Sequence, residues 1–161
     1  MKIFVLTKRQ YMGKDLLDDR FGRFREIPLE LAQLGHEVAG LTVSYRAREE
    51  TATWDSAPAT NASVKWESLN VTARSINRFR HILEIVEEFK PDLIWACSDA
   101  YIVSLGVWLA QKVATLCIVD LTAHIEHPQI CRAFLRGCGA SDRTRANQTR
   151  QMQPRTTLEV K

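Results

Sequence analysis

A segment rich in charged residues, Lys8 to Gly22, follows the first apolar segment of the chain and is expected to be a long loop. Within the 13 positions from Lys8 to Arg20 it holds four cations and a tyrosine: Lys8, Arg9, Lys14, Arg20 and Tyr11. Such side chains could hold an anionic or sugar-like ligand above a sheet. A loop of mixed charge that contacts only solvent is the alternative, and the sequence leaves both open. We predict these five residues as substrate-binding residues.

Three further polar residues stand where apolar, strand-like segments end. Ser98 and Asp99 follow Leu93–Cys97, and Asp120 follows Thr115–Val119. A carboxylate at such a place can cap the helix that begins there or face a ligand, and capping is the commoner outcome. We predict Asp99 as a catalytic residue, and Ser98 and Asp120 as substrate-binding residues.

Motifs that bind cofactors or metals are missing. Thr7 is followed by Lys-Arg-Gln-Tyr-Met-Gly rather than GxGxxG, and no GxxxxGK[ST] occurs, so we predict no cofactor. Cys97 and Cys117 fall in strand-like segments and are expected to be buried, inert thiols. Four later residues have the side chains that zinc prefers, but their spacing matches no standard pair of ligand pairs, and we predict no metal: His124, His127, Cys131 and Cys138.

The hydrophobic pattern predicts the elements that would position these residues. Strand-like segments occur at five places: Lys2–Thr7, Glu37–Ser44, Val64–Leu69, Leu93–Cys97 and Thr115–Val119. Helical spacing occurs between them, in about residues 27–34, 75–89 and 99–112. This alternation predicts an α/β fold, a Rossmann-like open parallel sheet with helices on both faces. Pro28 is expected in the first helical turn, which places the helix start near Ile27, and Tyr45–Ala62 is expected to be a loop.

Length and charge set the domain organisation. The chain has 161 residues, 45% of them apolar, and a net charge of +3, as is typical of one globular domain. Residues 1–113 hold 15 basic and 15 acidic residues, whereas residues 114–161 hold 7 and 4, so the excess charge lies at the end. We predict a domain at residues 1–125 and an irregular or disordered basic tail at residues 126–161. Out-of-frame translation after about residue 120 is one explanation of the change.

The absence of a secretory signal or a long apolar segment predicts a cytoplasmic protein with reduced cysteines. The arginines of the second predicted helix are followed by glutamates, Glu84, Glu87 and Glu88, and this pattern does not favour nucleic-acid binding. Peripheral contact with the inner face of a membrane stays open, through a small basic patch.

Three segments carry a resemblance to a known family. They are Leu31-Ala-Gln-Leu-Gly-His-Glu-Val38, Lys90-Pro-Asp-Leu-Ile94 and Leu105-Gly-x-x-Leu-Ala110. In this order and spacing, residues 1–120 resemble the N-terminal domain of family 4 glycosyltransferases of the GT-B fold. The resemblance implies two Rossmann-like domains that face each other across a cleft, with the acceptor on the N-terminal domain and the nucleotide-sugar on the C-terminal one.

The resemblance also implies a reaction, the retaining transfer of a hexosyl group from a nucleotide-sugar to a glycan or lipid-linked acceptor. Many members carry histidines in a pattern like Pro-Asp-x-x-His-x-His, where this chain has Trp95 and Cys97, so no catalytic histidine is carried over. Asp99 stands near that site by position. A donor-binding domain is missing or lies on a separate chain, and we expect the isolated chain to be inactive.

Two alternatives stay open. One is a non-catalytic Rossmann-like binding or interaction module, or one subunit of a split enzyme. The other is a doubly wound enzyme that uses a different nucleotide, which the missing glycine fingerprint disfavours.

Overall fold

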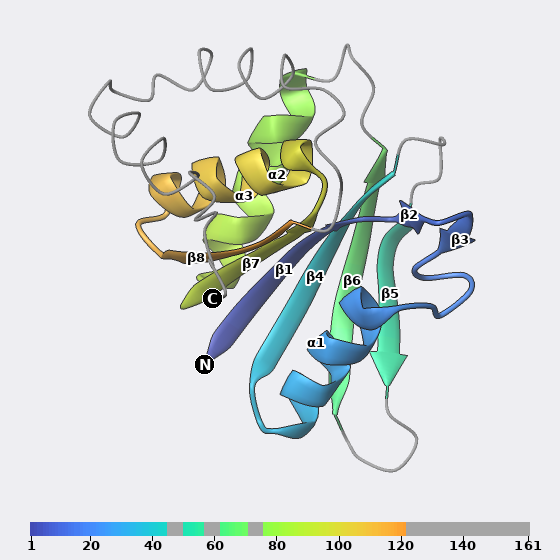
Figure 1. The fold of residues 1–161 in the computed structure, drawn as a ribbon. Helices are drawn as coiled ribbons and strands as arrows, with labels where there is room; N and C mark the ends of the chain where they lie inside the picture. The colour runs from blue at the N-terminus through green and yellow to red at the C-terminus, as the bar shows by residue number, and fades with distance from the viewer. Residues whose placement is uncertain (45–49, 57–61, 71–75, 122–161) are drawn as a thin grey trace, which may run out of the picture.

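A computed structural model describes residues 1–44, 50–56, 62–70 and 76–121 (Figure 1). The strands of its main sheet are β1 Lys2–Lys8, β4 Glu37–Ser44, β5 Glu50–Ser56, β6 Ser63–Asn70, β7 Leu93–Ser98 and β8 Leu116–Leu121. A small hairpin, β2 Gln10–Tyr11 with β3 Lys14–Asp15, follows β1. The helices of the described residues are α1 Arg23–Gln33, α2 Ile76–Phe89 and α3 Ala100–Lys112.

The main sheet has the strand order β5-β6-β4-β1-β7-β8, with β1 near its centre. Neighbours from β6 to β8 pair in parallel, and β5 pairs antiparallel with β6 at one edge. The predicted Rossmann-like parallel sheet is therefore confirmed. The parallel register aligns Thr7 with Cys97 and Cys97 with Asp120, which brings the carboxyl ends of β1, β7 and β8 to the same edge.

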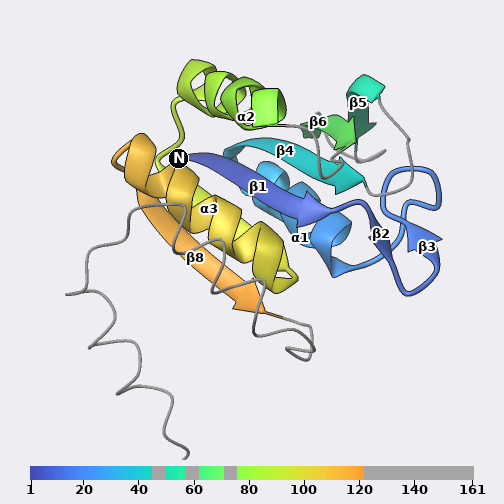
Figure 2. The same cartoon turned by 90° about the horizontal axis from the view of Figure 1, so that it is seen from above.

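Successive side chains of a strand point to opposite faces of the sheet, and the central strands are apolar on both faces. Helices therefore cover both faces. Ile3 and Val5 belong to the core cluster beneath α1, whereas Phe4 and Leu6 belong to the cluster beneath α2 and α3. Figure 2 shows α1 and α3 against opposite sides of the sheet. The apolar segments of the central strands are thus buried on both sides.

Contact between α3 and the sheet depends on a glycine. A Cβ added at Gly106 would lie 2.2 Å from the Cβ of Ala96 in β7, so that only glycine fits at this point of α3. Its neighbours Leu105 and Leu109 are fully buried against the same face.

The first helix begins earlier than predicted. It starts at Arg23, after Gly22 (φ 94°), whose carbonyl oxygen accepts from the amides of Arg25 and Glu26. Pro28 therefore lies inside the helix rather than in its first turn. The proline lacks the amide that would bond to the carbonyl of Phe24, and its ring is buried, so packing offsets the missing hydrogen bond.

Two segments expected to be loops contain strands. Residues 50–56, within the predicted loop Tyr45–Ala62, form β5, and the sequence between Lys8 and Gly22 contains the β2–β3 hairpin. The pairing of β5 is supplied by the edge of β6, which the local sequence does not reveal. At the other edge, β8 is apolar and exposed, with Leu116 71% and Ile118 52% accessible.

The predicted tail at residues 126–161 lies outside the described residues. The residues considered for zinc, from His124 to Cys138, lie outside them as well.

Candidate functional site

The candidate site lies where the chain leaves adjacent strands toward opposite faces of the sheet. After β1 the chain passes to α1 on one face, and after β7 it passes to α3 on the other. Ligands of open α/β sheets bind outside the carboxyl ends of the strands at such a switch point. Five residues at this edge, Lys8, Arg23, Ser98, Asp99 and Asp120, are called the switch-point cluster below.

Asp99 caps α3 and also contacts a cation. Its Oδ1 accepts a hydrogen bond from the Ile102 amide at 3.1 Å, and its Oδ2 lies 3.9 Å from the Nζ of Lys8. Both side chains are partly buried, at 33% exposed for Lys8 and 29% for Asp99. Burial, and to a lesser degree the charge of Asp99, raises the pKa of Tyr101, two positions further along the chain. The capping interpretation is confirmed, and a catalytic role stays a prediction.

Ser98, the last residue of β7, is buried and has an unusual backbone conformation. Its φ is 117°, a region that residues with a side chain rarely adopt. Such a conformation costs about 1–3 kcal/mol and persists only where the surrounding structure enforces it. Here the chain must turn from the strand into the capped first turn of α3.

Asp120 connects β8 to the start of α1. Its Oδ1 accepts a hydrogen bond from the Nη2 of Arg23 at 2.8 Å, although the two residues are 97 positions apart. Sequence reasoning placed Asp120 at this edge but missed Arg23, because Gly22 marked the end of the charged loop.

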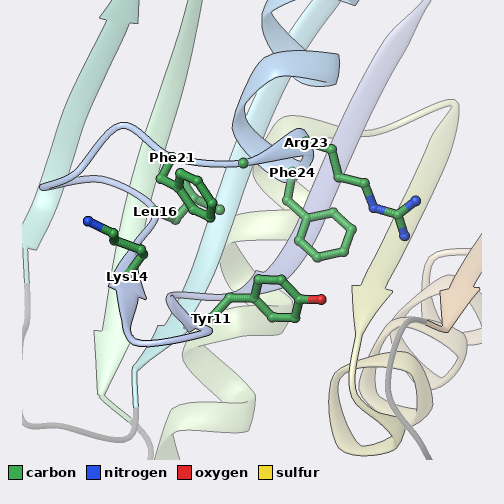
Figure 3. A pocket seen from close by; sticks show the side chains of 7 residues that line it. Tyr11, Lys14, Leu16, Phe21, Arg23 and Phe24 are labelled. Atoms are coloured by element: carbon green, nitrogen blue, oxygen red, sulfur yellow. The ribbon is translucent and has the colours of Figure 1, made fainter.

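A pocket opens between the hairpin and the start of α1 (Figure 3). Its volume is about 100 Å³, and its lining residues include Tyr11, Lys14, Leu16, Phe21, Arg23 and Phe24. Lys14 and Arg23 project on opposite sides, with the aromatic rings between them. Lys14 and Tyr11 thus line the same pocket, and their substrate-binding role stays a prediction, whereas the exposed Arg20, at φ 47°, does not line the pocket.

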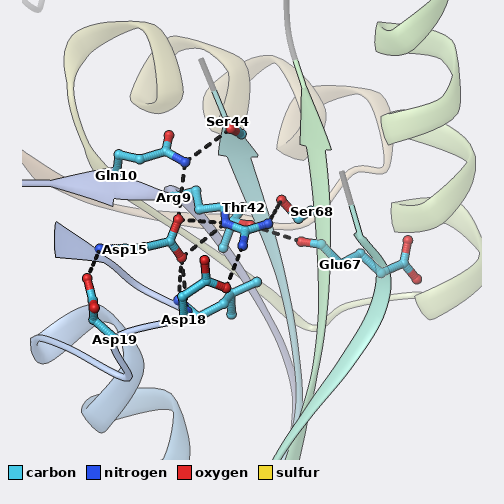
Figure 4. Close-up of polar contacts among 10 residues, drawn as sticks. Arg9, Gln10, Asp15, Asp18, Asp19, Thr42, Ser44, Glu67 and Ser68 are labelled. Carbon is cyan, nitrogen blue, oxygen red and sulfur yellow. Dashed lines mark hydrogen bonds and ion pairs between the residues drawn. The ribbon is translucent and has the colours of Figure 1, made fainter. Parts of the chain in front are cut away.

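The hairpin that carries Tyr11 and Lys14 is fixed by a buried arginine (Figure 4). The Arg9 side chain is fully buried, and its Nε donates to both carboxylate oxygens of Asp15 at 3.1 and 2.9 Å. Its Nη2 donates to Asp18 at 3.0 Å, and its Nη1 donates to Ser68 in β6 at 3.0 Å. Arg9 therefore positions the hairpin on the sheet from beneath, away from solvent.

A second polar contact attaches the hairpin to β4. The Nε2 of Gln10 donates to the Oγ of Ser44 at 3.1 Å and to Asp15 at 3.3 Å. The turn of the hairpin consists of Met12 and Gly13, at φ 51° and 75°, the signs that a type I′ turn requires. These contacts give the pocket wall a defined position.

Burial disfavours the thiolate forms of the described cysteines. Burial raises the pKa of the Cys97 thiol to about 12, and its Sγ lies 3.5 Å from the carbonyl oxygen of Leu6, to which it donates. Burial also raises the pKa of Cys117. Among the residues that the structure describes, no three His, Cys, Asp or Glu side chains gather in a way that could hold a metal ion.

The fold and the polar cluster define the class of the molecule, a Rossmann-like α/β domain with ionic side chains at its switch point. No model of a protein family matches the chain, and neither a curated protein nor a solved structure matches it. In the described part of the chain, the helices are too short or too polar to cross a membrane.

Proposed function

We propose that the chain is the acceptor-binding, N-terminal half of a glycosyltransferase of the family 4 type. The reaction would be the retaining transfer of a hexosyl group from a nucleotide-sugar to a glycan or lipid-linked acceptor. The observation that carries the proposal is the position of Asp99, a partly buried carboxylate at the carboxyl end of β7, within 3.9 Å of Lys8. The ordered resemblance of residues 1–120 supplies the reaction class.

Four of the five members of the switch-point cluster have a role in this proposal. Asp99 would accept or orient the hydroxyl of the acceptor, since a carboxylate near a cation is suited to bind a polar hydroxyl group. Lys8 and Arg23 would attract anionic groups of the acceptor, and Ser98 would add a polar side chain at the same edge of the sheet. The nucleotide-sugar would be bound by a second domain, further along the polypeptide or on another chain.

The first experiment tests whether these 161 residues act as a half-enzyme. The purified chain is incubated with radiolabelled nucleotide-hexoses and a glycan and lipid extract, alone and with a donor-binding domain from the downstream or neighbouring reading frame. We expect no transfer by the chain alone and transfer with the added domain. Robust turnover by the chain alone would contradict the half-enzyme, and no transfer in any combination would contradict the glycosyltransferase.

The second experiment tests Asp99 in the active combination. Asp99→Asn keeps a side chain that caps helices well but removes the charge. We expect a loss of kcat of at least about tenfold with little change in Tm, because general acid–base and electrostatic contributions are of that size or larger. Glu30→Gln, at an exposed position of α1, is the control and should retain full activity.

A non-catalytic binding or interaction module is the second candidate. One observation favours it, the pairing of the cluster's charged groups with one another, Lys8 with Asp99 and Arg23 with Asp120. Co-purification of a fixed protein partner that is indifferent to nucleotide-sugars would support this candidate and count against the first.

A further inference from the structure

The pocket beside the hairpin has walls that suit an apolar group. Leu16 and Phe24 form its interior and are only 5% and 4% exposed. Tyr11 and Phe21 at its rim keep 37% and 46% of their surfaces in solvent. Aromatic rings that surround a hollow while partly exposed gain free energy when an apolar group enters and displaces water.

The aromatic walls are held in place before any ligand arrives. The Tyr11 ring packs edge-on against Phe24 at 6.0 Å between centroids, and Phe24 packs in the same manner against Trp95 of β7 at 6.3 Å. The other end of the hairpin is fixed by the buried Arg9 and its carboxylate partners. A ligand therefore has little ordering entropy to offset, which favours binding.

Cations lie on both sides of the apolar walls (Figure 3). Arg23 is bonded to Asp120 and stacks over the Phe24 ring at 5.0 Å, so part of its charge is neutralised. Lys14 is exposed on the opposite side. The nearby carboxylates of Asp15 and Asp18 are bonded to Arg9, and the Oδ2 of Asp19 accepts from the amide of Asp15. The pocket thus favours an anion near Lys14.

We propose that this pocket binds a single ring or short branched alkyl group that carries a phosphate or a carboxylate. At about 100 Å³ the pocket is smaller than the closed cavity of about 150 Å³ that holds benzene, so one ring would fill it and extend partly into solvent. The anionic group would contact Lys14, and the apolar group would lie against Phe21 and Tyr11. This binding does not rest on the proposed function.

The test uses phenyl phosphate as the probe, with inorganic phosphate and benzyl alcohol as its separate halves. The full chain is titrated, and amide chemical shifts are followed by NMR. We expect phenyl phosphate to shift the amides of residues 10–24 and to bind at least about tenfold more tightly than either half, because charged and apolar contacts add. Shifts confined to another part of the chain, or no shifts at all, would overturn the proposal.

Two variants and a control separate the contributions. Lys14→Met should weaken the binding of phenyl phosphate about tenfold and leave the binding of benzyl alcohol unchanged, because it removes one charged hydrogen bond to the phosphate. Phe21→Ala should weaken the binding of both probes, because it removes an apolar contact with the ring. Lys90→Met removes an exposed charge at the opposite end of the sheet and should change neither. Equal affinity in all variants would overturn the proposal.

Vesicles distinguish the two sources of such a ligand. Phosphatidic acid vesicles are compared with phosphatidylcholine vesicles in a sedimentation assay. Selective binding that Lys14→Met and Phe21→Ala both abolish would support the pocket and identify a lipid headgroup as its source. Binding of phenyl phosphate without vesicle binding would support the pocket with a soluble ligand. Vesicle binding that neither variant affects would overturn it.

The outcomes also separate this proposal from the proposed function. If phenyl phosphate does not bind, the proposal for the pocket fails, but the results of the transfer assay and of Asp99→Asn are not affected. Probe binding without transfer in any combination would support the pocket and count against the glycosyltransferase.

Discussion

The guanidinium group of Arg9 lies fully buried with its Nε 2.9 Å from a carboxylate oxygen of Asp15. This ion pair joins the end of the central strand to the hairpin that carries two of the pocket residues. A buried charge is tolerated only with such partners, because its desolvation costs several kcal/mol otherwise. The pair therefore links the sheet core to the geometry of the candidate site.

Arg9→Met should be strongly destabilising. The change leaves the carboxylates of Asp15 and Asp18 without their cation, and breaking a buried pair in this way costs about 3 kcal/mol. Urea denaturation followed by circular dichroism measures the difference in the free energy of unfolding. Lys65→Met is the control, since Lys65 is exposed and its pair with the partly buried Glu67 should contribute less than about 1 kcal/mol. Similar losses in both variants would contradict the role given to Arg9.

Gly106→Ala should destabilise the protein although alanine favours helices. The added Cβ would lie 2.2 Å from that of Ala96, and overpacking of this kind costs about 1–3 kcal/mol. Gln111→Ala on the exposed side of α3 serves as the control and should stay within about 0.5 kcal/mol of the parent. Adding Ala96→Gly to Gly106→Ala should recover part of the loss; if it does not, the contact is not the cause.

The sequence was sufficient to predict the parallel sheet. Strands that are buried on both faces, such as those at Lys2–Thr7 and Leu93–Cys97, have nearly continuous apolar sequences, which can be recognised without knowledge of their partners. It was not sufficient for β5, whose polar residues pair only because β6 offers them an edge. The carboxyl ends of strands were correctly expected to gather the polar residues.

The inward direction of Arg9 and the partnership of Arg23 could not be predicted. Arg9 bonds to Ser68, 59 positions away, and Arg23 bonds to Asp120, 97 positions away. Such partners are set by topology, and neither local periodicity nor residue type reveals them.

Asp99→Ala and Asp99→Asn should differ in stability. Alanine removes the acceptor for the Ile102 amide and should lower the free energy of unfolding by about 1 kcal/mol, whereas asparagine caps nearly as well as aspartate. The contact with Lys8 is long and partly exposed, so its loss adds less than about 1 kcal/mol. Thermal denaturation of both variants measures the difference. Equal losses would show that the charge, rather than the cap, stabilises this end of α3.

Cys97 should make the stability of the protein fall at high pH. Burial raises the pKa of its thiol in the folded state to about 12, so the unfolded chain loses this proton at lower pH than the folded one. The neutral thiol therefore stabilises the fold fully below the thiol's ordinary pKa, and this contribution is lost as the pH rises toward 12. Comparing Tm for the parent and Cys97→Ala between pH 8 and pH 11, about the range where a free thiol ionises, should show a steeper decline for the parent. Alkylation with iodoacetamide at pH 8, mapped by mass spectrometry, should leave Cys97 unmodified until the protein is unfolded. Rapid modification of native Cys97, or parallel Tm curves, would contradict the buried thiol.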